Sequence, residues 1–450
     1  MSMLSGKAPK SILLVGAGAR EHAIADALCR KRDIRLLVVA HNDNPGLASL
    51  ADVLERHEET DAKWIADWAH DQSVHLAVIG LEDPLAVGLP DQLAKKGIPT
   101  VGPCQAAAQL ETSKLFTRDL MRRYNIAGQV EYRYISDVGS LREYLSSSSK
   151  EFALKPIGLT AGKGVRVMGE QLGSLAEAIA YGEKVIKERI GGVAGIIVEE
   201  RIVGPEFTLQ AFVDGKTVLP MPLVRDFKRA FEGDQGPNTG GMGSYSQPDG
   251  LLPYVTRQQY GEAVDILRHI VKALRSEGIE YRGIMYGQFM MTHEGMRLIE
   301  INARFGDPEA MNVLPLLEND FVDVCQAIVD GDLHKVNLRF QPKATVCKYI
   351  VPRGYGSVPR EGAQISLKRS RIESLGVKVY FAKVERRDSV LLTTTSRTVA
   401  LLGIGDSISE AESVVEEALQ YVEGDFHVRH DIGKARTLQT DQRRFEKVRV

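Results

Sequence analysis

The first hundred residues alternate short apolar runs with stretches of helical periodicity, and this alternation restricts the fold more than any other feature. The runs SILLVGAG, RLLVVAH, LAVIG and IPTVG have the length and continuous hydrophobicity of strands buried on both faces of a parallel sheet. The stretches REHAIADALCRK, DAKWIADWAHD and AVGLPDQLAKKG carry apolar residues at helical spacing. This order predicts a doubly wound parallel α/β domain that ends near residue 103.

The rest of the chain mixes helices and strands. Helices are expected at SKLFTRDLMRRYN and SLAEAIAYGEKVIKER, with short strands between about 130 and 200. A helix at about 256–277, a strand pair at about 283–302 and a helix near 308–330 follow. From about 340, the runs ATVCKYIV, VKVYFAKV and VALLGIG predict strands, and SISEAESVVEEALQYV predicts one helix.

Composition and charge limit the classes of function. The 450 residues are 44% hydrophobic and 26% charged, and the formal net charge of −2 gives no overall basic field for nucleic acid. The four cysteines show neither a CxxC pair nor metal-ligand spacing, so we expect reduced thiols. No run approaches the ~18–20 apolar residues of a membrane helix, and no signal-peptide core precedes the first strand. We therefore expect a cytoplasmic protein that binds neither nucleic acid nor membranes.

The stretch LKPIGLTAGKGVRVMG, at 154–169, is close to a phosphate-binding P-loop but differs in spacing and context. A P-loop has GxxxxGK[ST] between a strand and a helix. Here three residues separate Gly158 from Gly162, and Gly164 rather than a hydroxyl residue follows Lys163. Because VRVM alternates like a strand, the context is strand, loop, strand. Such a loop predicts a mobile cover over phosphates, and a plain surface hairpin is the alternative.

The segment VGAGAREHA follows the first strand and invites comparison with the dinucleotide fingerprint GxGxxG. The third glycine would stand at position 21, where the chain has Glu21, a carboxylate that disfavours a pyrophosphate. Gly16, Gly18 and Arg20 still suit one phosphate bound by backbone N–H groups and a guanidinium. We expect a phosphosugar site, with a tight strand-to-helix turn as the alternative, and we interpret His22 as a helix-surface residue.

The segment at 284–310 predicts a metal site built from oxygen ligands. Glu300 and Asn302 are two apart in a strand pattern and share one face, which suits Mg²⁺ or Mn²⁺ bound together with phosphate oxygens. A three-residue turn HEG, with Gly295 in the left-handed conformation, would place Gln288 opposite Glu300 as a third ligand. Arg304 continues the alternation and could clamp a phosphate or carboxylate. A solvated strand face is the alternative.

Two further segments add charge and flexible backbone. DFKR contains Asp226 and Lys228, and GPNTGGMGSY at 237–245 sets Asn and Thr among glycines, which supplies donors on a backbone able to wrap a ligand. A merely flexible loop is the alternative for either segment alone.

Taken together, the motifs resemble those of one enzyme family. The matching segments are GAGAREHA, PTVGPCQAAAQLETSKLFTRDLM, KPIGLTAGKGV, VEERIVGPEFTLQ, DFKR, GPNTGGMGSYS, EINARFGDPEAM and RHDIG. They resemble the phosphoribosylamine–glycine ligases of the ATP-grasp superfamily. The resemblance implies an N-terminal doubly wound parallel α/β domain (1–112), an ATP-grasp core of two α+β lobes (113–340, with a mobile lobe at about 130–200) and a small mixed β/α C-terminal domain (341–450).

The resemblance also implies a reaction. The family uses ATP to join glycine to 5-phosphoribosylamine through glycyl phosphate, and it releases ADP and phosphate in purine biosynthesis. The implied cofactors are ATP and Mg²⁺ or Mn²⁺, and the implied assembly is a monomer or a weak homodimer.

Roles for individual residues follow from the same resemblance. The implied ATP-binding residues are Lys114, Lys155, Gly158, Gly162, Gly164, Glu199, Glu200, Ile202 and Glu206. The implied substrate-binding residues are Gly18, Arg20, Glu82, Asn238, Thr239 and Gly240. The implied metal ligands are Gln288, Glu300 and Asn302. The implied catalytic residues are Arg304, Asp226 and Lys163.

The chain departs from the family pattern in several segments, among them GAGAREHA where the family has GNGGREHA, and GLEDPL where the family has GPEAPL. Ile157 stands where the family usually has Asp, Ala17 replaces an Asn, and Phe227 replaces the His of DHKR. Two other functions stay open: an ATP-grasp ligase with a different acceptor, and a regulatory nucleotide-binding protein descended from such a ligase. Glu21 argues against a dehydrogenase.

Overall fold

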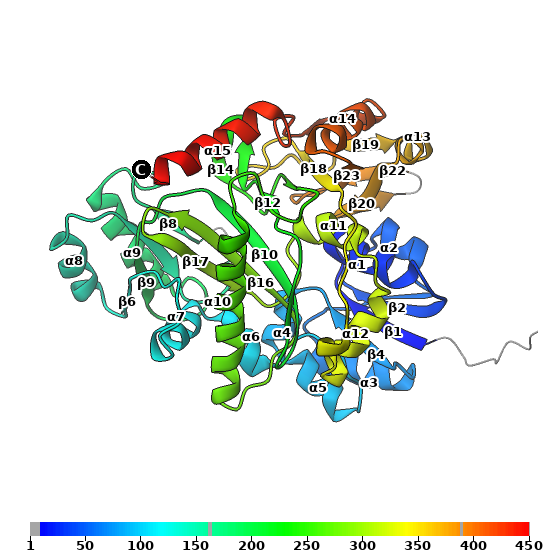
Figure 1. The fold of residues 1–450 in the computed structure, drawn as a ribbon, viewed down its shortest axis with the longest axis horizontal. Helices are drawn as coiled ribbons and strands as arrows, with labels where there is room; N and C mark the ends of the chain where they lie inside the picture. Colours follow the sequence, from blue (N-terminus) through cyan, green and yellow to red (C-terminus); the bar gives the residue numbers. More distant parts are fainter. Residues whose placement is uncertain (1–9, 161–163, 388–389, 450) are drawn as a thin grey trace, which may run out of the picture.

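The computed structural model describes residues 10–160, 164–387 and 390–449, and its N-terminal part is the predicted doubly wound domain (Figure 1). Five parallel strands pair in the order β3-β2-β1-β4-β5. They are β1 (Lys10–Val15), β2 (Ile34–Ala40), β3 (Val53–Arg56), β4 (Leu76–Ile79) and β5 (Thr100–Val101). The helices are α1 (Ala19–Cys29), α2 (Pro45–Leu50), α3 (Ala62–Asp71), α4 (Glu82–Ala86), α5 (Leu89–Lys95) and α6 (Gln105–Thr112).

Two details of this part differ from the prediction. The strand β3 was not predicted, because VLER lacks a continuous apolar run. The helix expected at AVGLPDQLAKKG begins only at Leu89, as α5, because α4 ends at Ala86 and Gly88 between them takes a left-handed φ of 77°.

The strand order creates a position for ligands. The chain turns from β1 towards β2 on one side and towards β4 on the other, so the carboxyl ends of β1 and β4 are neighbours at the point where the order reverses. Ligands of open α/β sheets bind outside such a point. The loop with Gly16 and Gly18 follows β1, and Glu82 begins the helix after β4.

The middle of the chain forms two antiparallel sheets. The first has the order β6-β9-β7-β8 and its own hydrophobic core under two helices. Its elements are β6 (Tyr132–Ile135), α8 (Val138–Ser146), β7 (Phe152–Pro156), β8 (Arg166–Val167), α9 (Leu175–Glu188) and β9 (Ile196–Glu200). Because β7 and β8 are antiparallel partners, the predicted context of strand, loop and strand is confirmed.

The second sheet has the order β11-β10-β16-β17. Its strands are β10 (Glu206–Asp214), β11 (Val218–Pro220), β16 (Arg282–Thr292) and β17 (Gly295–Asn302). The helices α7 (Lys114–Arg123), α10 (Arg257–Ser276) and α12 (Phe321–Asp330) contact this sheet, and α11 (Glu309–Val313) follows β17 along the chain. The helix expected near 308–330 is thus interrupted, and a 3-10 turn at Leu314–Leu316 that contains Pro315 lies between α11 and α12.

The hairpin of β16 and β17 confirms one part of the prediction and corrects another. Gln288 is the partner of Glu300, as expected. The turn, however, has two residues rather than three, because Thr292 pairs with Gly295. A one-residue irregularity after Gln288 restores the predicted register, and Gly295 has the expected positive φ, 103°.

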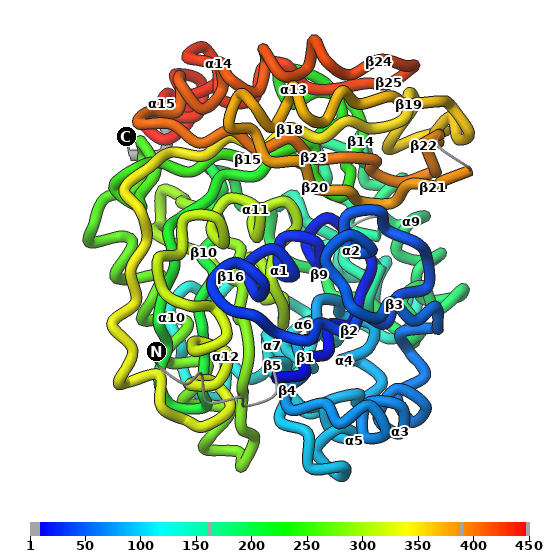
Figure 2. The backbone as a smooth tube through the Cα atoms, turned by 90° about the vertical axis from the view of Figure 1, so that its right-hand side faces the viewer, coloured from blue at the N-terminus to red at the C-terminus, as the bar shows by residue number. Residues whose placement is uncertain are grey.

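The C-terminal part contains a sheet that also takes strands from the middle of the chain. Its order is β12-β15-β18-β23-β20, and β25 pairs with β18. Figure 2 shows β15 beside β18. The strands are β12 (Arg225–Asp226), β15 (Gly243–Ser246), β18 (Ala344–Pro352), β20 (Lys378–Phe381), β23 (Val399–Gly405) and β25 (Phe426–His427). The sheet therefore joins DFKR and the end of GPNTGGMGSY to the C-terminal residues.

A second C-terminal sheet and three helices complete the chain. This sheet has the order β21-β22-β19-β24, with β19 (Gln364–Leu367), β21 (Val384–Arg387), β22 (Val390–Thr393) and β24 (Val422–Gly424). The helices are α13 (Arg369–Ser374), α14 (Ile408–Leu419) and α15 (Ala435–Arg449), and a short ribbon of β13 (Arg229–Phe231) and β14 (Gln235–Asn238) lies earlier in the chain. Across the described residues, none of the helices is long and apolar enough to cross a membrane.

His22 and Asn44 connect the N-terminal and C-terminal parts. The interpretation of His22 as a surface residue is wrong: it is 4% exposed, and its Nδ1 accepts the N–H of Phe381 at 3.0 Å. Burial lowers the pKa of His22 to about 4, so the ring is neutral at pH 7. Asn44 caps α2 through Oδ1, and its Nδ2 donates to the carbonyls of Ala17 (2.9 Å) and Phe381 (2.7 Å).

Candidate active site

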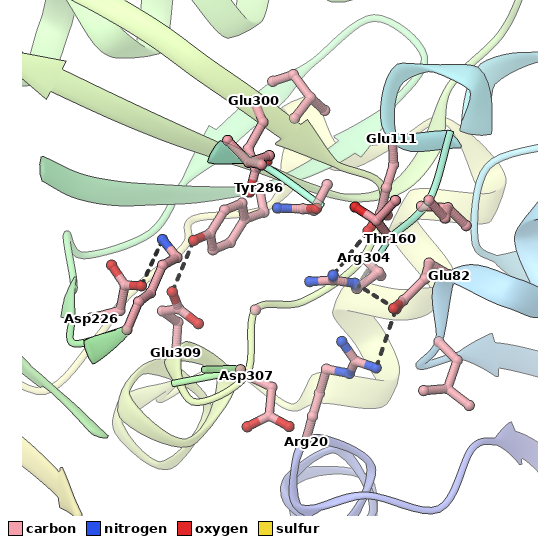
Figure 3. A pocket seen from close by; sticks show the side chains of 18 of the residues that line it. Arg20, Glu82, Glu111, Thr160, Asp226, Tyr286, Glu300, Arg304, Asp307 and Glu309 are labelled. Carbon is pink, nitrogen blue, oxygen red and sulfur yellow. Dashed lines mark hydrogen bonds and ion pairs between the residues drawn. The ribbon is translucent and has the colours of Figure 1, made fainter. Parts of the chain in front are cut away.

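A cavity of about 490 Å³ is lined by residues from all three parts of the chain. Figure 3 labels lining residues from the N-terminal part and from the middle of the chain. Many of the residues predicted to form the site line this cavity, although they lie far apart in the sequence. Those that line it are Gly18, Arg20, Glu82, Lys114, Glu199, Asp226, Asn238, Thr239, Gly240, Glu300, Asn302 and Arg304. The predicted residues Lys155, Gly158, Gly164, Glu200, Ile202, Glu206 and Gln288 are outside this lining, and Gly162 and Lys163 lie outside the described residues.

Glu300 and Asn302 project into the cavity from the end of β17. Both are half-buried, and neither side chain has a hydrogen bond or ion pair with another described residue. A carboxylate withdrawn from water without a partner is costly, so this pair suits a cation. The described residues hold no group of three His, Cys, Asp or Glu side chains arranged for a metal. Two oxygen ligands completed by phosphate oxygens are typical of Mg²⁺, which seldom has an all-protein cage.

Gln288 lies opposite Glu300, but both of its polar atoms are engaged. Its Oε1 accepts the hydroxyl of Tyr286 at 2.6 Å, and its Nε2 donates to Oε2 of Glu206 at 2.6 Å. The side chain is 1% exposed. A metal at Gln288 would have to share the amide oxygen with the Tyr286 hydroxyl through its second lone pair, and Glu206 is held by the same chain of bonds.

Lys155 and Arg118 surround Glu199 at the wall of the cavity. Lys155 on β7 lies 2.6 Å from Oε2 of Glu199 on β9, and Nε of Arg118 on α7 lies 2.7 Å from Oε1. Burial alone would raise the pKa of Glu199, but the two cations outweigh it and lower the pKa to about 2. Glu200 follows on the strand and accepts the N–H of Glu131 at 3.1 Å.

Lys114 begins α7 directly after the capping residue Ser113. Its Nζ donates to the carbonyl of Gly158 at 3.1 Å and so contacts the start of the glycine loop. Burial lowers the pKa of Lys114, and the carboxylate of Glu300 opposes the shift. Both residues line the same cavity.

The start of the glycine loop is tightly packed. A Cβ on Gly158 would lie 2.1 Å from the carbonyl oxygen of Gly191, so only glycine fits there. Leu159 and Thr160 then line the cavity. Ile157, where the resemblance expects Asp, is a buried apolar residue.

Glu21 occupies the donors at the start of α1. Its Oε2 accepts the N–H of Gly18 at 2.6 Å, and its Oε1 accepts Nε of Arg20 at 2.6 Å. The carboxylate therefore stands where a pyrophosphate would bind, which is the physical reason against a dinucleotide. Arg20 also donates to the carbonyl of Phe305 at 3.1 Å, so the guanidinium links α1 to the loop after β17.

Arg304 pairs with two carboxylates from the N-terminal part (Figure 3). Its Nε lies 3.1 Å from Oε2 of Glu82, and its Nη2 lies 2.9 Å from Oε1 of Glu111. Burial raises the pKa of Glu111 to about 7 despite Arg304. At Glu82, Arg304 and Arg20 outweigh burial and lower the pKa to about 2. Glu111 was not predicted as a site residue, although it lies within the quoted motif QLETSK.

Asp226 and Glu309 are neighbouring buried carboxylates with different partners. Oδ2 of Asp226 is 2.9 Å from Nζ of Lys228, while Oδ1 has no hydrogen-bond partner in the described structure. Burial and the charge of Asp226 raise the pKa of Glu309 to about 7. Oε1 of Glu309 lies 3.0 Å from the hydroxyl of Tyr286. Because that hydroxyl has one proton and faces Gln288 at 2.6 Å, a protonated Glu309 satisfies both contacts.

The side chain of Thr239 fixes the loop of residues 237–243 through two hydrogen bonds to the backbone. The hydroxyl of Thr239 donates to the carbonyl of Lys228 at 2.8 Å and accepts the N–H of Gly241 at 3.0 Å. The segment therefore presents Asn238 and Gly240 on a fixed backbone rather than on a loose loop.

Four residues of the C-terminal part line the cavity and were not predicted: Tyr355, Thr395, Ser396 and Arg397. They belong to no motif. The loops that Tyr355 and Arg397 contact lie between 90 and 157 residues away in the sequence, so no local pattern could have identified them.

Comparison with family models matches most of the chain. The description Phosphoribosylglycinamide synthetase applies to all three matches: its N domain at residues 10–111, its ATP-grasp (A) domain at 112–310 and its C domain at 345–435.

Individual proteins agree with these matches. The chain is 46% identical over 430 residues to a phosphoribosylamine–glycine ligase of Methanocella arvoryzae, which covers 95% of this chain and 97% of the relative. It is 47% identical to a phosphoribosylamine–glycine ligase of Methanothermobacter thermautotrophicus, over 97% of this chain and 99% of the relative.

Solved structures give the same fold. The crystal structure of a phosphoribosylamine–glycine ligase from Thermotoga maritima is 26% identical, with a TM-score of 0.78 over 94% of this chain and 99% of that chain. The biotin carboxylase domain of the Hydrogenobacter thermophilus 2-oxoglutarate carboxylase shares the fold at 15% identity and a TM-score of 0.74, over 98% of each chain. By its sequence over nearly its full length and by its fold, the chain belongs to the phosphoribosylglycinamide synthetase family.

Proposed function

We propose that the chain joins glycine to 5-phosphoribosylamine at the expense of ATP, in purine biosynthesis. The observation that carries this proposal is the similarity over 95% of the chain to phosphoribosylamine–glycine ligases at 46% identity. The cavity supports it, since it brings together cations, two oxygen ligands and the Gly18 turn at the end of the N-terminal sheet.

The reaction divides into two steps. A carboxylate oxygen of glycine bonds to the γ-phosphorus of ATP while the bond to the bridging oxygen breaks and ADP leaves. The amine of phosphoribosylamine then bonds to the acyl carbon of glycyl phosphate, phosphate leaves, and the nitrogen loses a proton. Activation is needed because a carboxylate is a poor electrophile.

Cations in the site stabilise the phosphoryl group during transfer. In the proposal Lys114 and Lys155 hold the ATP phosphates, and Arg304 and Asp226 face the reacting groups, because fixed charges in a site shielded from water stabilise charge that develops in the transition state. The adenosine would lie along Glu199, Glu200, Ile202 and Glu206. Residues 158–164, which include Lys163, would cover the phosphates.

Glu300 and Asn302 are the proposed ligands of a divalent ion, Mg²⁺ or Mn²⁺. Their free oxygens at the cavity wall fit such an ion, and Gln288 would add an amide oxygen that already accepts the Tyr286 hydroxyl. The ion would neutralise phosphate charge as the γ-phosphoryl group moves.

The acceptor would bind at the other end of the cavity. Gly18, Arg20 and Glu82 would hold phosphoribosylamine at the carboxyl ends of β1 and β4, with the N–H of Gly18 and Nε of Arg20 exchanging Glu21 for the ligand. Asn238, Thr239 and Gly240 would flank the substrates. The proposed domains are residues 1–112, 113–340 and 341–450, with residues of about 130–200 as the lobe that moves. This lobe has a hydrophobic core of its own. The protein would act in the cytoplasm as a monomer or a weak homodimer.

The test is the release of ADP from ATP and Mg²⁺, with glycine and freshly prepared phosphoribosylamine added singly and together. We expect sustained ADP release only with both, and glycinamide ribonucleotide as the product. Glycine-dependent ADP release with a different amine would indicate another acceptor. Tight ATP binding without glycine-dependent turnover would indicate a regulatory protein.

A further inference from the structure

A segment of the C-terminal part reaches the cavity between β22 and β23. Thr395, Ser396 and Arg397 line the cavity there. Thr394 fixes the turn that precedes them, because its hydroxyl donates to the carbonyl of Lys383 at 3.0 Å and accepts the N–H of Ser396 at 3.2 Å. Arg397 therefore extends from a segment whose backbone is fixed by hydrogen bonds.

The guanidinium of Arg397 joins two loops of the cavity wall. Its Nη1 donates to the carbonyl of Gly240 at 2.8 Å and to the carbonyl of Asp307 at 3.0 Å, and its Nη2 lies 2.8 Å from Oδ2 of Asp307. The group lies over the ring of Tyr349, 4.6 Å from its centroid, and the side chain is 15% exposed. Charge-assisted bonds at a shielded site are strong and directional, so one side chain fixes the distance between the loops.

Two tyrosines of the C-terminal part support the same connection. The hydroxyl of Tyr349 donates to Oδ1 of Asp307, and the N–H of Gly240 donates to the hydroxyl of Tyr355 at 3.3 Å. Gly240 and Asp307 are thus each held by two side chains that belong to the C-terminal part.

These loops lie at the acceptor end of the proposed site. Asp307 follows Phe305, whose carbonyl accepts Arg20, and Arg304, which pairs with Glu82. Arg20 and Glu82 are the proposed contacts of phosphoribosylamine.

The lysines proposed for ATP have different partners. Lys114 contacts Gly158 and Lys155 contacts Glu199. A substitution of Arg397 should therefore weaken binding of the acceptor more than binding of the nucleotide.

We infer that Arg397 is a positioning residue for the acceptor: it holds the loops at Gly240 and Asp307 in the one arrangement that binds phosphoribosylamine. The inference rests on the proposed function and deepens it, because it assigns part of the acceptor site to the C-terminal part of the chain.

The test compares Arg397→Ala and Arg397→Lys with the control Arg360→Ala. Arg360 is another arginine of the C-terminal part, is 73% exposed and pairs with Asp425 at 2.8 Å away from the cavity. The measurements are the KM for phosphoribosylamine, the Kd of ADP, the Kd of ribose 5-phosphate as an unreactive probe, and the thermal unfolding midpoint.

We expect Arg397→Ala to raise the KM for phosphoribosylamine and the Kd of ribose 5-phosphate by about tenfold to a hundredfold, as displaced binding groups do. The Kd of ADP should change less than about twofold. Arg397→Lys should be intermediate, because an ammonium keeps the charge but lacks the fork that bridges both loops. Arg360→Ala should match the wild type.

Two results would overturn the inference: an unchanged KM and Kd in a folded Arg397→Ala protein, or equal losses of ADP and ribose 5-phosphate binding. If Arg397→Ala does not fold, Tyr349→Phe removes a single bond to Asp307 and should give a smaller loss confined to the acceptor; no loss there would overturn it as well. A wild-type protein without glycine-dependent turnover would instead contradict the proposed function, and the ribose 5-phosphate comparison would still decide the role of Arg397.

Discussion

Glu199 and Glu309 are both fully buried carboxyl groups of the same site, yet their pKa values move in opposite directions. Arg118 and Lys155 contact Glu199 directly and lower its pKa to about 2. Glu309 has Asp226 as its strongest electrostatic neighbour, and burial with this like charge raises its pKa to about 7. The partner, rather than burial itself, decides which carboxyl group is charged at neutral pH.

The raised pKa of Glu309 predicts a pH dependence of stability. The folded value lies above the ordinary value of 4.5, so the stabilising contribution is present below about pH 4.5 and is lost as the pH rises through about 7. Glu309→Gln keeps a neutral side chain and removes this term. Relative to the wild type, its free energy of unfolding should rise by about 1–3 kcal/mol between pH 5 and pH 8.

Urea unfolding of both proteins at pH 5, 6, 7 and 8 measures this difference. Glu188→Gln, on the exposed end of α9, is the control and should follow the wild type at every pH. Parallel curves for Glu309→Gln and the wild type would show that Glu309 is charged throughout this range.

Glu300 allows a second prediction at the residue scale. Glu300→Ala should reduce turnover by at least about a hundredfold, because a fixed charge at the phosphoryl group is lost, and should weaken Mn²⁺ binding in the presence of ADP. The unfolding midpoint should not fall, since the half-buried carboxylate makes no hydrogen bond or ion pair with a described residue and its burial is costly.

The control for Glu300 is Glu294→Ala in the turn of the same hairpin, where the exposed carboxylate pairs with Arg297. Paramagnetic resonance of Mn²⁺ and steady-state ADP release measure the two effects. Normal Mn²⁺ binding in a folded Glu300→Ala protein would rule out the metal assignment.

At the scale of elements, the hairpin of β7 and β8 differs from a P-loop in the element that comes after the loop. A P-loop presents the N-terminus of a helix to the phosphate, whereas here a second strand pairs back onto the first. The glycine at the base of the loop serves a packing role, because Gly158 approaches the backbone at Gly191. The proposed binding of phosphate by this element therefore relies on backbone groups and lysines rather than on a helix N-terminus.

Gly158→Ala tests the packing role. The added Cβ would meet the carbonyl oxygen of Gly191 at 2.1 Å, which should destabilise the protein by about 1–3 kcal/mol. ATP affinity should fall as well, because Lys114 donates to the Gly158 carbonyl.

The control is Gly261→Ala in α10, where a Cβ has open space around it. It should stabilise the protein by about 0.5–1 kcal/mol. Calorimetric titration with ATP measures the affinity, and denaturant unfolding measures the stability. A Gly158→Ala protein with wild-type stability would show that the backbone at Gly191 moves aside at little cost.

At the scale of the whole molecule, a few polar contacts join the N-terminal and C-terminal parts. Asn44 and His22 meet the backbone of Phe381, and Asp26 on α1 lies 3.3 Å from Nζ of Lys378. The C-terminal sheet also takes in β12 and β15, which carry Asp226 and the end of the loop of residues 237–243. The cavity thus depends on how three parts of the chain are held together.

Asn44→Asp tests the connection of the two parts. The substitution keeps the oxygen that caps α2, but it replaces the donor to Ala17 and Phe381 with an oxygen facing their carbonyls. A buried charge without a partner should lower the free energy of unfolding by about 3–5 kcal/mol.

Asn337→Asp, at an exposed position, is the control for Asn44→Asp and should change stability by less than about 0.5 kcal/mol. Equilibrium unfolding in urea measures both variants. Equal stabilities would mean that the contact at Phe381 adds nothing to the folded state.

Periodic patterns explain which features could be predicted from the sequence. The strand runs of the first hundred residues, the shared face of Glu300 and Asn302 and the pairing of Gln288 with Glu300 depend on spacing within an element or across one turn. The pKa directions and the engaged amide of Gln288 could not be predicted, because they depend on neighbours supplied by other elements.

The amino-acid sequence was enough to predict the parallel N-terminal sheet, the loop between two strands at 154–169 and, through its motifs, the family. The three-dimensional packing was needed to establish that His22 is buried, that Glu111 pairs with Arg304 and that Arg397 reaches Gly240 across 157 residues of chain. The physical reason is distance along the chain. The periods of helices and strands depend on residues that are close in the sequence, whereas charge pairing and burial depend on which surfaces pack together in the folded protein.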